Sequence, residues 1–554
     1  MVKWFFSLFN RDFGGLHEAA FLLGVSAIFS QILALFRDRL FASTFGTGTT
    51  LDIYYASFRI PDLIYVIIAS LVAATVLIPF LIDRFASHSH EDVRHFLNSV
   101  LTMFLGLLLG ASLLAFILLP YVADTLVPGF SEKELSSFIL LSRILLIQPI
   151  FLGLSNLLGA VTQAFRRFFL YALAPILYNV GIIIGILFFY EPFGIAGLGY
   201  GVILGAFLHL IVQIPFVADR NLIPIPTSRP NMGDIKNVFM LSLPRTVTLS
   251  ANNVIVIILT ALASLLGSGS IAVFNLSYNL QAVPLAVIGM SYSVAAFPTL
   301  VKLFAEGNKE HFVRYIVVAA KHIIFWSLPA LSLFIVLRAQ IVRVILGAGA
   351  FTWTDTRLTA ASLALFSFSV VAQGLILLFV RGYYAAGNTK KPLMANLSAS
   401  IVTILLAFVF LRWFERFPAF TNFFEVLFRV SDVAGTKILM LPLAFSLGSL
   451  LNMTILWQFF KRDFKEHYIS VRKSVFTALA GALIIGTVSF YLLRFFDDFF
   501  NINTFTGIFM QGFLSGIGGI ISGMVFFEFI KDKEYMVFKK IFVDKFFTRK
   551  KSLY

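Results

Sequence analysis

Fourteen separate stretches of mostly apolar residues run along this 554-residue chain, and they limit its fold more than any other feature. A helix needs about 20 such residues to cross the ~30 Å hydrocarbon core of a membrane. Charged residues make up only 13% of the chain, against about 25% in soluble proteins. The sequence therefore predicts an all-α polytopic membrane protein and excludes a soluble enzyme, a disordered protein and a nucleic-acid-binding domain. The expected spans are 18–43, 52–82, 95–121, 135–163, 168–190, 194–218, 236–265, 270–300, 312–337, 357–386, 391–411, 438–460, 473–494 and 505–530.

The distribution of Lys and Arg predicts the orientation in the membrane. The loops on the same side as the N-terminus carry most of these cations, and eight lie in the tail after Ile530. The positive-inside rule then places both termini in the cytoplasm. Residues 1–16 combine Trp and Phe with Lys3 and Arg11, a pattern that predicts an interfacial amphipathic helix.

Short motifs recur in the same order and at a nearly constant spacing. Phe45-Gly46-Thr47-Gly48 returns as Leu266-Gly267-Ser268-Gly269, and Pro79 returns as Pro298. Pro175 with Asn179 returns as Pro392 with Asn396. An even number of helices in each copy makes the two copies parallel repeats, an arrangement that places a substrate site between two lobes and suits alternating access. The expected parts are an N-lobe of six helices (17–219), a cytoplasmic linker (220–235), a C-lobe of six helices (236–460), two extra helices (461–530) and a basic cytoplasmic tail (531–554).

Charged residues inside the expected spans gather in the first two. A charge at membrane depth is costly unless it faces protein or water, and the arginine fork matches phosphate oxygens. We therefore predict that Arg37, Asp38, Arg59 and Arg245 surround an anionic group, with structural ion pairs as the alternative. Further polar residues are expected to line the cavity or to bond neighbouring helices: Gln31, Asp52, Asp62, Asn252, Asn253, Asn279 and Gln281.

The sequence contains no motif of a catalytic, metal or cofactor site. A P-loop, an HExxH and a GxSxG pattern are all missing, and the chain has no Cys. We expect no catalytic residues, no metal and no cofactor, and hence a transporter rather than an enzyme. The energy source stays open among membrane potential, sodium and proton.

Two long motifs bear a family resemblance. The first comprises three nearby segments: Ala34-Leu35-Phe36-Arg37-Asp38-Arg39, Phe45-Gly46-Thr47-Gly48, and residues Asp52 to Asp62. The second is Arg381-Gly382-Tyr383-Tyr384-Ala385-Ala386-Gly387-Asn388-Thr389-Lys390-Lys391-Pro392. This pattern resembles the MurJ (MviN) lipid II flippase family.

The resemblance implies a multidrug/oligosaccharidyl-lipid/polysaccharide exporter fold in the bacterial cytoplasmic membrane. It implies a monomer that moves an undecaprenyl-diphosphate-linked peptidoglycan precursor from the inner to the outer leaflet. The implied partners are that lipid-linked glycan and membrane lipids, without nucleic acid, and helices 13 and 14 are expected to hold the lipid tail. It also places Arg37 and Asp38 at family positions tied to the charge cluster of the cavity.

Several family charges are neutral in this chain. The family's arginines before Arg37 and after the second-span proline fall at Gln31 and Tyr65, and its helix-8 arginine falls at Asn279. We hypothesise that Arg59 and Arg245 restore positive charge from other positions.

Other functions remain open on the sequence. The alternatives are a flippase for another undecaprenyl-linked glycan, an amphiphile antiporter, a membrane scaffold, and a polytopic lipid glycosyltransferase or glycan polymerase. Such an enzyme needs a carboxylate in a water-exposed loop, and the loop 412–437 offers Glu415, Glu425 and Asp432. The Phe-rich pattern of this loop is more typical of an interfacial helix.

Overall fold

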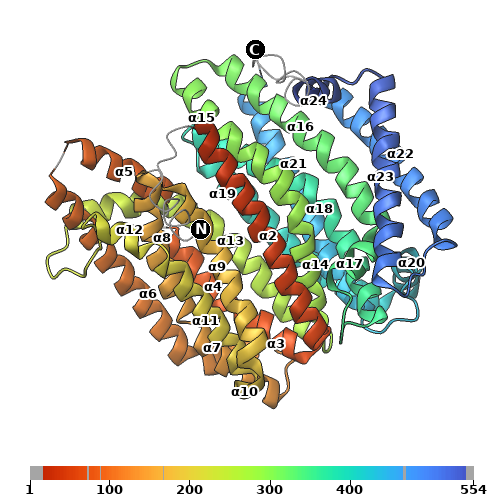
Figure 1. Ribbon diagram of the computed structural model, residues 1–554, viewed down its shortest axis with the longest axis horizontal. Helices are drawn as coiled ribbons and strands as arrows, with labels where there is room; N and C mark the ends of the chain where they lie inside the picture. Colours follow the sequence, from red (N-terminus) through yellow and green to blue (C-terminus); the bar gives the residue numbers. More distant parts are fainter. Residues whose placement is uncertain (1–15, 71–73, 88, 166, 466–469, 544–554) are drawn as a thin grey trace, which may run out of the picture. The chain divides into compact units, whose positions relative to one another are not determined.

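The computed structural model describes the backbone of residues 16–70, 74–87, 89–165, 167–465 and 470–543, and every regular element in these ranges is a helix (Figure 1). Residues 1–15 of the predicted amphipathic helix and residues 544–554 of the predicted tail lie outside the described part. An α-helix pairs its backbone N–H and C=O groups within the segment, which is what a chain in lipid requires. The all-α prediction is confirmed.

The chain forms two compact units, which are described separately here. The first consists of residues 1–272 with 349–351, and the second of residues 273–348 with 352–554. Each has its own apolar core, built around side chains such as Phe96 and Phe104 in the first unit and Phe312 and Phe379 in the second.

The helices of the first unit follow one another closely along the chain. In order they are α2 (Leu16–Phe45), α3 (Thr49–Ser57), α4 (Arg59–Ala69), α5 (Ala74–Ser87), α6 (His90–Leu126), α7 (Glu132–Leu145), α8 (Gln148–Ala164), α9 (Phe168–Ile184), the π-helix η1 (Gly185–Phe189), α10 (Tyr190–Phe193), α11 (Ile195–Ile211), α12 (Ile214–Asp219) and α13 (Met232–Ser264).

Residues 220–272 pack with the first unit, although the sequence predicts 236–265 as part of the C-lobe. The hydroxyl oxygens of Ser70, after α4, and Thr246, in α13, lie 2.6 Å apart. Arg84 of α5 forms an ion pair with Asp234 of α13. The division into lobes 17–219 and 236–460, with the pair 461–530, stays a prediction.

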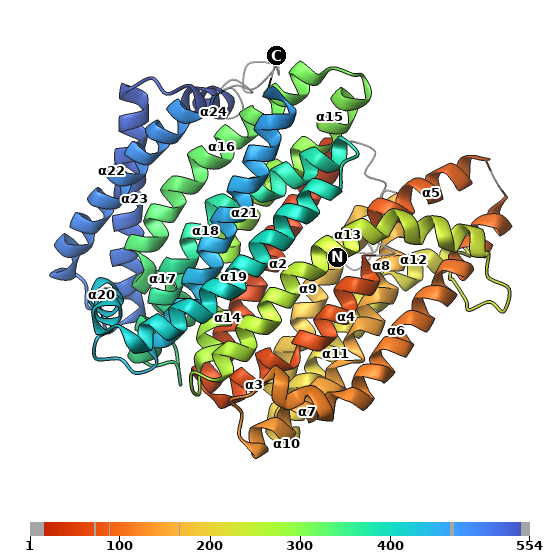
Figure 2. The ribbon, with the colours of Figure 1, turned by 180° about the vertical axis from the view of Figure 1, so that it is seen from behind.

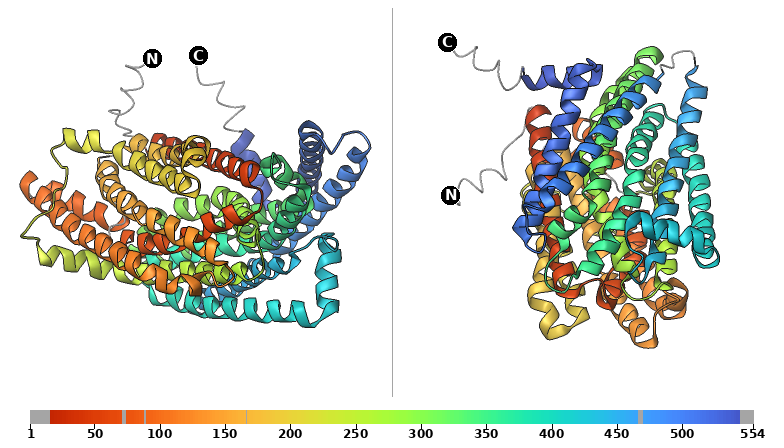
Figure 3. Two further views of the ribbon diagram at one scale, coloured as in Figure 1. Left: turned by 90° about the horizontal axis from the view of Figure 1, so that it is seen from below. Right: turned by 90° about the vertical axis from the view of Figure 1, so that its right-hand side faces the viewer.

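The helices of the second unit are seen in green to blue in Figures 1 and 2. Here α22 and α23 pack side by side (Figures 1 and 3). The elements are α14 (Ser270–Pro284), which starts at the end of the first unit, the π-helix η2 (Leu285–Met290), α15 (Ser291–Ala305), α16 (Lys309–Val336), α17 (Arg338–Leu346), α18 (Trp353–Ala385), α19 (Lys390–Arg416), α20 (Pro418–Phe428), the 3₁₀-helix η3 (Thr436–Leu439), α21 (Met440–Asp463), α22 (Arg472–Asp497), α23 (Phe505–Phe529) and α24 (Lys533–Val543).

Eleven helical segments among the described residues are long and apolar enough to cross a membrane. The other three expected spans are helical as α2, as α3 to α5 and as α13. These three are the segments that carry the predicted site charges. The chain is thus a helical multi-pass membrane protein, and the count of fourteen spans stays a prediction.

The expected second span, 52–82, is broken near its start. α3 ends at Ser57 and α4 begins at Arg59, with Pro61 as its third residue. Pro61 has no N–H to donate to the Ser57 carbonyl, and its ring crowds that carbonyl, so a helix cannot run through unchanged. The break expected from Pro61 is confirmed, and it sets Arg59 at the start of a new helix.

Glycines bring α9 and α11 into backbone contact within the first unit. A Cβ built on Gly181 would lie 2.2 Å from the Cα of Gly205, and one on Gly205 would lie 2.3 Å from the carbonyl oxygen of Tyr178. Small residues permit such close helix approach in membranes, where van der Waals packing drives association. This crossing fixes α9, and with it Asn179, inside the first unit.

We expect Gly205→Ala to destabilise the protein by about 1–3 kcal/mol, because the added methyl forces α9 and α11 apart. The thermal unfolding midpoint of the purified protein in detergent measures this. Gly110→Ala in α6 is the matched control, since a Cβ there meets nothing within 4 Å. An unchanged midpoint for Gly205→Ala would show that this crossing does not hold the unit together.

Candidate functional site

A buried network of charges and amides joins α2 to α9 in the first unit. The Arg37 guanidinium donates from Nε and Nη2 to Asp38 Oδ1, at 3.1 and 2.8 Å, and from Nη1 to Asn179 Oδ1, at 2.9 Å. Asp38 is almost fully buried, whereas the Arg37 side chain keeps 19% of its surface exposed. Three bonds use three of the five N–H donors of a guanidinium, so Arg37 can still bind a further acceptor.

A second pair of opposite charges lies at the start of α4. Asp62 interacts electrostatically with Arg59 and is hydrogen-bonded to Gln148, the first residue of α8. Gln148 is buried, and its own Oε1 has no hydrogen-bond partner. Each of the two pairs combines one arginine with one aspartate and is formally neutral.

Tyrosines lie near both charge pairs. Tyr55 of α3 lies near Asp38, Arg37 and Arg59, and Tyr178 of α9 lies near Asp62 and Arg37. The buried Tyr55 hydroxyl has no hydrogen-bond partner. We call Arg37, Asp38, Arg59, Asp62 and Asn179 the charge cluster.

Asn179 is the residue of this cluster that sequence reasoning missed as a site residue. It lies four residues after Pro175, and its Nδ2 donates to the Pro175 carbonyl. The repeated Asn396, four residues after Pro392, accepts a hydrogen bond from Asn452 Nδ2 at 3.1 Å. The repeat of Pro175 with Asn179 as Pro392 with Asn396 is the sequence feature that could have identified Asn179. The two copies use the same amide differently, toward an arginine in one unit and an asparagine in the other.

Asp52, predicted to line the cavity, instead binds backbone N–H groups. Its two carboxylate oxygens accept from the amides of Gly269, at 2.6 Å, and Ala272, at 2.7 Å. These amides begin α14, where unpaired N–H groups and the helix dipole favour a carboxylate. Nearby, the hydroxyls of Thr49 and Ser268 lie 2.9 Å apart, so the two repeated Gly-containing turns contact each other.

The remaining predicted residues have varied surroundings. Gln281 is fully buried, and its Oε1 accepts from Gln373 Nε2 at 3.2 Å, so it bonds α14 to α18 as the alternative interpretation expected. Gln31 and Asn253 are half-buried and Asn252 is exposed, while Asn279 is half-buried in α14 of the second unit. Arg245 lies in α13, but its side chain is outside the described residues.

Tyr65, which stands where the family has an arginine, forms a neutral pair. Its hydroxyl accepts a hydrogen bond of 2.8 Å from Asn156 Nδ2 in α8. The family position is therefore filled by a polar group without charge, close in sequence to Asp62.

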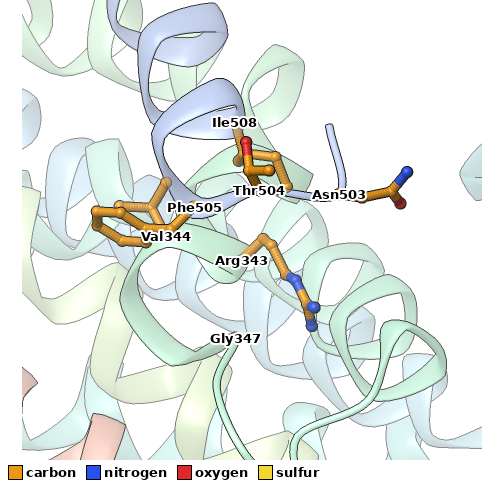
Figure 4. A pocket seen from close by; sticks show the side chains of 7 residues that line it. All are labelled: Arg343, Val344, Gly347, Asn503, Thr504, Phe505 and Ile508. Carbon is orange, nitrogen blue, oxygen red and sulfur yellow. The ribbon is translucent and has the colours of Figure 1, made fainter. Parts of the chain in front are cut away.

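A small cavity of about 110 Å³ lies in the second unit, between α17 and the start of α23 (Figure 4). Sites for drug-sized ligands are about 300–1,000 Å³, so this cavity is too small for a lipid-linked sugar. Its lining residues are Arg343, Val344, Gly347, Asn503, Thr504, Phe505 and Ile508.

The carboxylates considered for a glycosyltransferase are all engaged. Arg357 binds both carboxylate oxygens of Asp432, and this contact holds the pKa of Asp432 below its usual range. Glu415 pairs with Lys437, and Glu425 accepts from the Thr436 hydroxyl at 2.6 Å. A general acid needs a raised pKa near neutral pH, so Asp432 does not suit that role.

The chain is a helical multi-pass membrane protein whose α2 carries a paired arginine and aspartate. In fold, it is similar to an inward-facing multidrug resistance MATE family transporter of the MOP superfamily, with a TM-score of 0.64 and 15% identity, covering 79% of this chain and 95% of that one. It is also similar to a lipid II flippase MurJ in an inward closed conformation, with a TM-score of 0.72 and 20% identity, covering 92% of this chain and 99% of that one.

The family model of the lipid II flippase MurJ matches residues 41–509, so the chain belongs to that family. Curated relatives include the probable lipid II flippase MurJ of Buchnera aphidicola subsp. Acyrthosiphon pisum, 28% identical over 71% of this chain and 78% of the relative. The lipid II flippase MurJ of Burkholderia cenocepacia is 24% identical, and the match covers 70% of this chain and 77% of the relative. The family consists of transporters rather than enzymes, and its members are multi-pass proteins of the bacterial inner membrane. The resemblance from the sequence is confirmed.

We expect Asp52→Ala to lower stability by about 1–3 kcal/mol, since it leaves two buried N–H groups without an acceptor. Asp52→Asn, which keeps one acceptor oxygen, is expected to cost less. Thermal unfolding of the purified variants measures both. Loss of transport in Asp52→Ala at unchanged stability would instead identify Asp52 as a substrate ligand.

Proposed function

We propose that this chain moves lipid II, the undecaprenyl-diphosphate-linked peptidoglycan precursor, from the inner to the outer leaflet, and that the charge cluster binds the diphosphate. Membership of the MurJ family supports the activity. The observation that carries the site is Arg37, a half-buried arginine held by Asp38 and Asn179 with donors left for an acceptor.

The carboxylates have a role in this scheme. A buried arginine without a partner costs several kcal/mol, so Asp38 and Asp62 keep the cluster paired while it is empty. When the diphosphate binds, it accepts some of the arginine hydrogen bonds in place of the carboxylates. The carboxylates then compete with the diphosphate for these bonds. A site with built-in competitors binds an anion and also releases it, as a transporter must.

The wider mechanism follows the parallel repeat. We propose fourteen membrane spans with both termini in the cytoplasm, as the Lys and Arg distribution indicates. The protein acts as a monomer, by alternating access of two six-helix lobes. Membrane lipids surround it, and α22 and α23 offer the lipid tail an apolar surface, with exposed residues such as Phe476, Leu483 and Phe513.

The first test replaces the Arg37–Asp38 pair by neutral residues of similar size. The double variant Arg37→Gln/Asp38→Asn leaves no buried charge unpaired. In a bacterium depleted of its own flippase, we expect it to lower lipid II exposed on the outer leaflet by about tenfold or more. The reason is that a hydrogen bond to a charged group contributes about 1.5–3 kcal/mol, and 1.4 kcal/mol is tenfold.

The control is Arg143→Gln. Arg143 of α7 is also an arginine of the first unit, but it binds the Phe116 carbonyl and lies over the Phe116 ring. Full exposure of lipid II with the double variant, at normal membrane levels, would remove the diphosphate site from this cluster. If the unchanged chain itself restores no exposure, the substrate is another undecaprenyl-linked glycan.

A second test concerns the arginines expected to offset the neutral Gln31, Tyr65 and Asn279. We expect Arg59→Ala and Arg245→Ala each to weaken binding of an undecaprenyl-diphosphate-linked substrate to the purified protein, because each removes a cation. Native mass spectrometry of the protein with bound lipid measures the change. Unaltered binding in both variants would contradict the compensation.

A further inference from the structure

The helix α20 interrupts the connection between α19 and α21 in the second unit. It begins at Pro418, a favoured residue in the first turn of a helix, and ends at Arg429, whose φ of 58° is left-handed. In Figure 2, α20 is seen nearly end-on, while α19 and α21 run across the view. The helix thus lies across the direction of the spans that it connects.

One face of α20 packs on its own unit. Phe424 and Phe428 are buried, and the Phe420 ring centroid lies 6.0 Å from Trp413 and 6.2 Å from Phe410 of α19. The Arg338 guanidinium of α17 lies 5.9 Å from the Phe428 ring centroid. These contacts set which side of the helix faces outward.

Polar contacts hold both ends of the connection. Glu425 accepts a hydrogen bond from the Thr436 hydroxyl, Lys437 forms an ion pair with Glu415, and Arg357 forms an ion pair with Asp432. Arg357 also donates to the Arg429 carbonyl, the residue that ends the helix. α20 is therefore a positioned element, and its orientation is a property of the fold.

The opposite face of α20 is apolar and uncovered. Phe423, Val426 and Leu427 are 59%, 69% and 53% exposed, although water disfavours such surface. On α19, Ile401, Leu405 and Phe408 are exposed at helical spacing, and Trp413 and Phe417, which lie nearer to α20 in the chain, are exposed as well. The exposed surface of α20 thus continues the surface of a candidate membrane span.

Positive charges border this surface. Arg412 and Arg416 lie in the last turns of α19 and Arg429 follows α20, and all three are exposed. An amphipathic helix with cations beside an aromatic face is typical of the bilayer interface, where the apolar side enters the acyl boundary and arginines meet lipid phosphates. Water does not suit the apolar face, and a protein partner offers no reason for continuity with α19.

We propose that α20 is a membrane-surface helix, which seats Phe423, Val426 and Leu427 in the phospholipid headgroup region where α19 leaves the bilayer. The partner is the phospholipid surface itself. Lipid contact at α20 fixes the depth of α19 and α21 in the membrane, independently of the substrate bound at the charge cluster.

The chain has no native cysteine, so single substitutions can carry a spin label without background. Phe423→Cys and Val426→Cys report the exposed face, and Ser431→Cys, in the exposed loop after α20, is the matched control. The full-length labelled protein is placed in phospholipid nanodiscs. Collision with oxygen, which concentrates in lipid, is compared with collision with a water-soluble nickel chelate by power-saturation electron paramagnetic resonance.

We expect the oxygen-to-nickel ratio at 423 and 426 to be several-fold higher than at 431. Equal ratios at the three positions would place α20 in water and overturn the proposal. Low collision with both reagents, or dipolar broadening between labels, would show that protein or a second copy covers the face, and would overturn it as well. Transport of lipid II by each Cys-substituted chain is measured separately. A failure of the proposal for α20 can therefore be distinguished from a failure of the proposed function.

Discussion

Almost no water reaches the hydrocarbon core of a membrane, so a charge placed there must find its partners within the protein. The charge cluster satisfies this requirement with short-range contacts: Asp38 follows Arg37 along the chain, and Asn179 meets it from α9. The break between α3 and α4 sets Arg59 at the start of α4, three residues before Asp62. The second pair of opposite charges therefore also relies on residues that are close together in the chain.

Apolar stretches report directly on burial in lipid, which is why the helical class and most spans could be predicted from the sequence. Arg37 with Asp38, and the break before Pro61, could also be predicted, since their causes are local. Asn179 and Asp52 could not. Asn179 gains its role from the glycine crossing that positions α9, and Asp52 from the amides of Gly269 and Ala272, more than 200 residues away in the chain. Contacts of this kind depend on tertiary packing, which residue type and spacing do not specify.

The π-helices η1 and η2 and the amide pairs show how the two repeats have diverged. Asn179 and Asn396 occupy repeated positions after Pro175 and Pro392, yet one accepts from an arginine and the other from an asparagine. Gln281 adds a further neutral contact in the second unit. The Arg37–Asp38 pair lies in the first unit, whereas Asn396 and Gln281 of the second unit bond other amides.

The neutral pair of Tyr65 and Asn156 bears on what the cluster can hold. Tyr65 adds no charge beside the cluster, in which Asp38 and Asp62 balance Arg37 and Arg59. A dianion entering a formally neutral network is attracted less strongly than by free cations, but it meets guanidinium groups that are already oriented and need little reorganisation. A hydroxyl and an amide are well suited to hydrogen-bond the hydroxyl groups of a sugar. On the proposed function, this chain thus recognises its substrate with fewer net charges and more neutral hydrogen bonds, which favours release over tight binding.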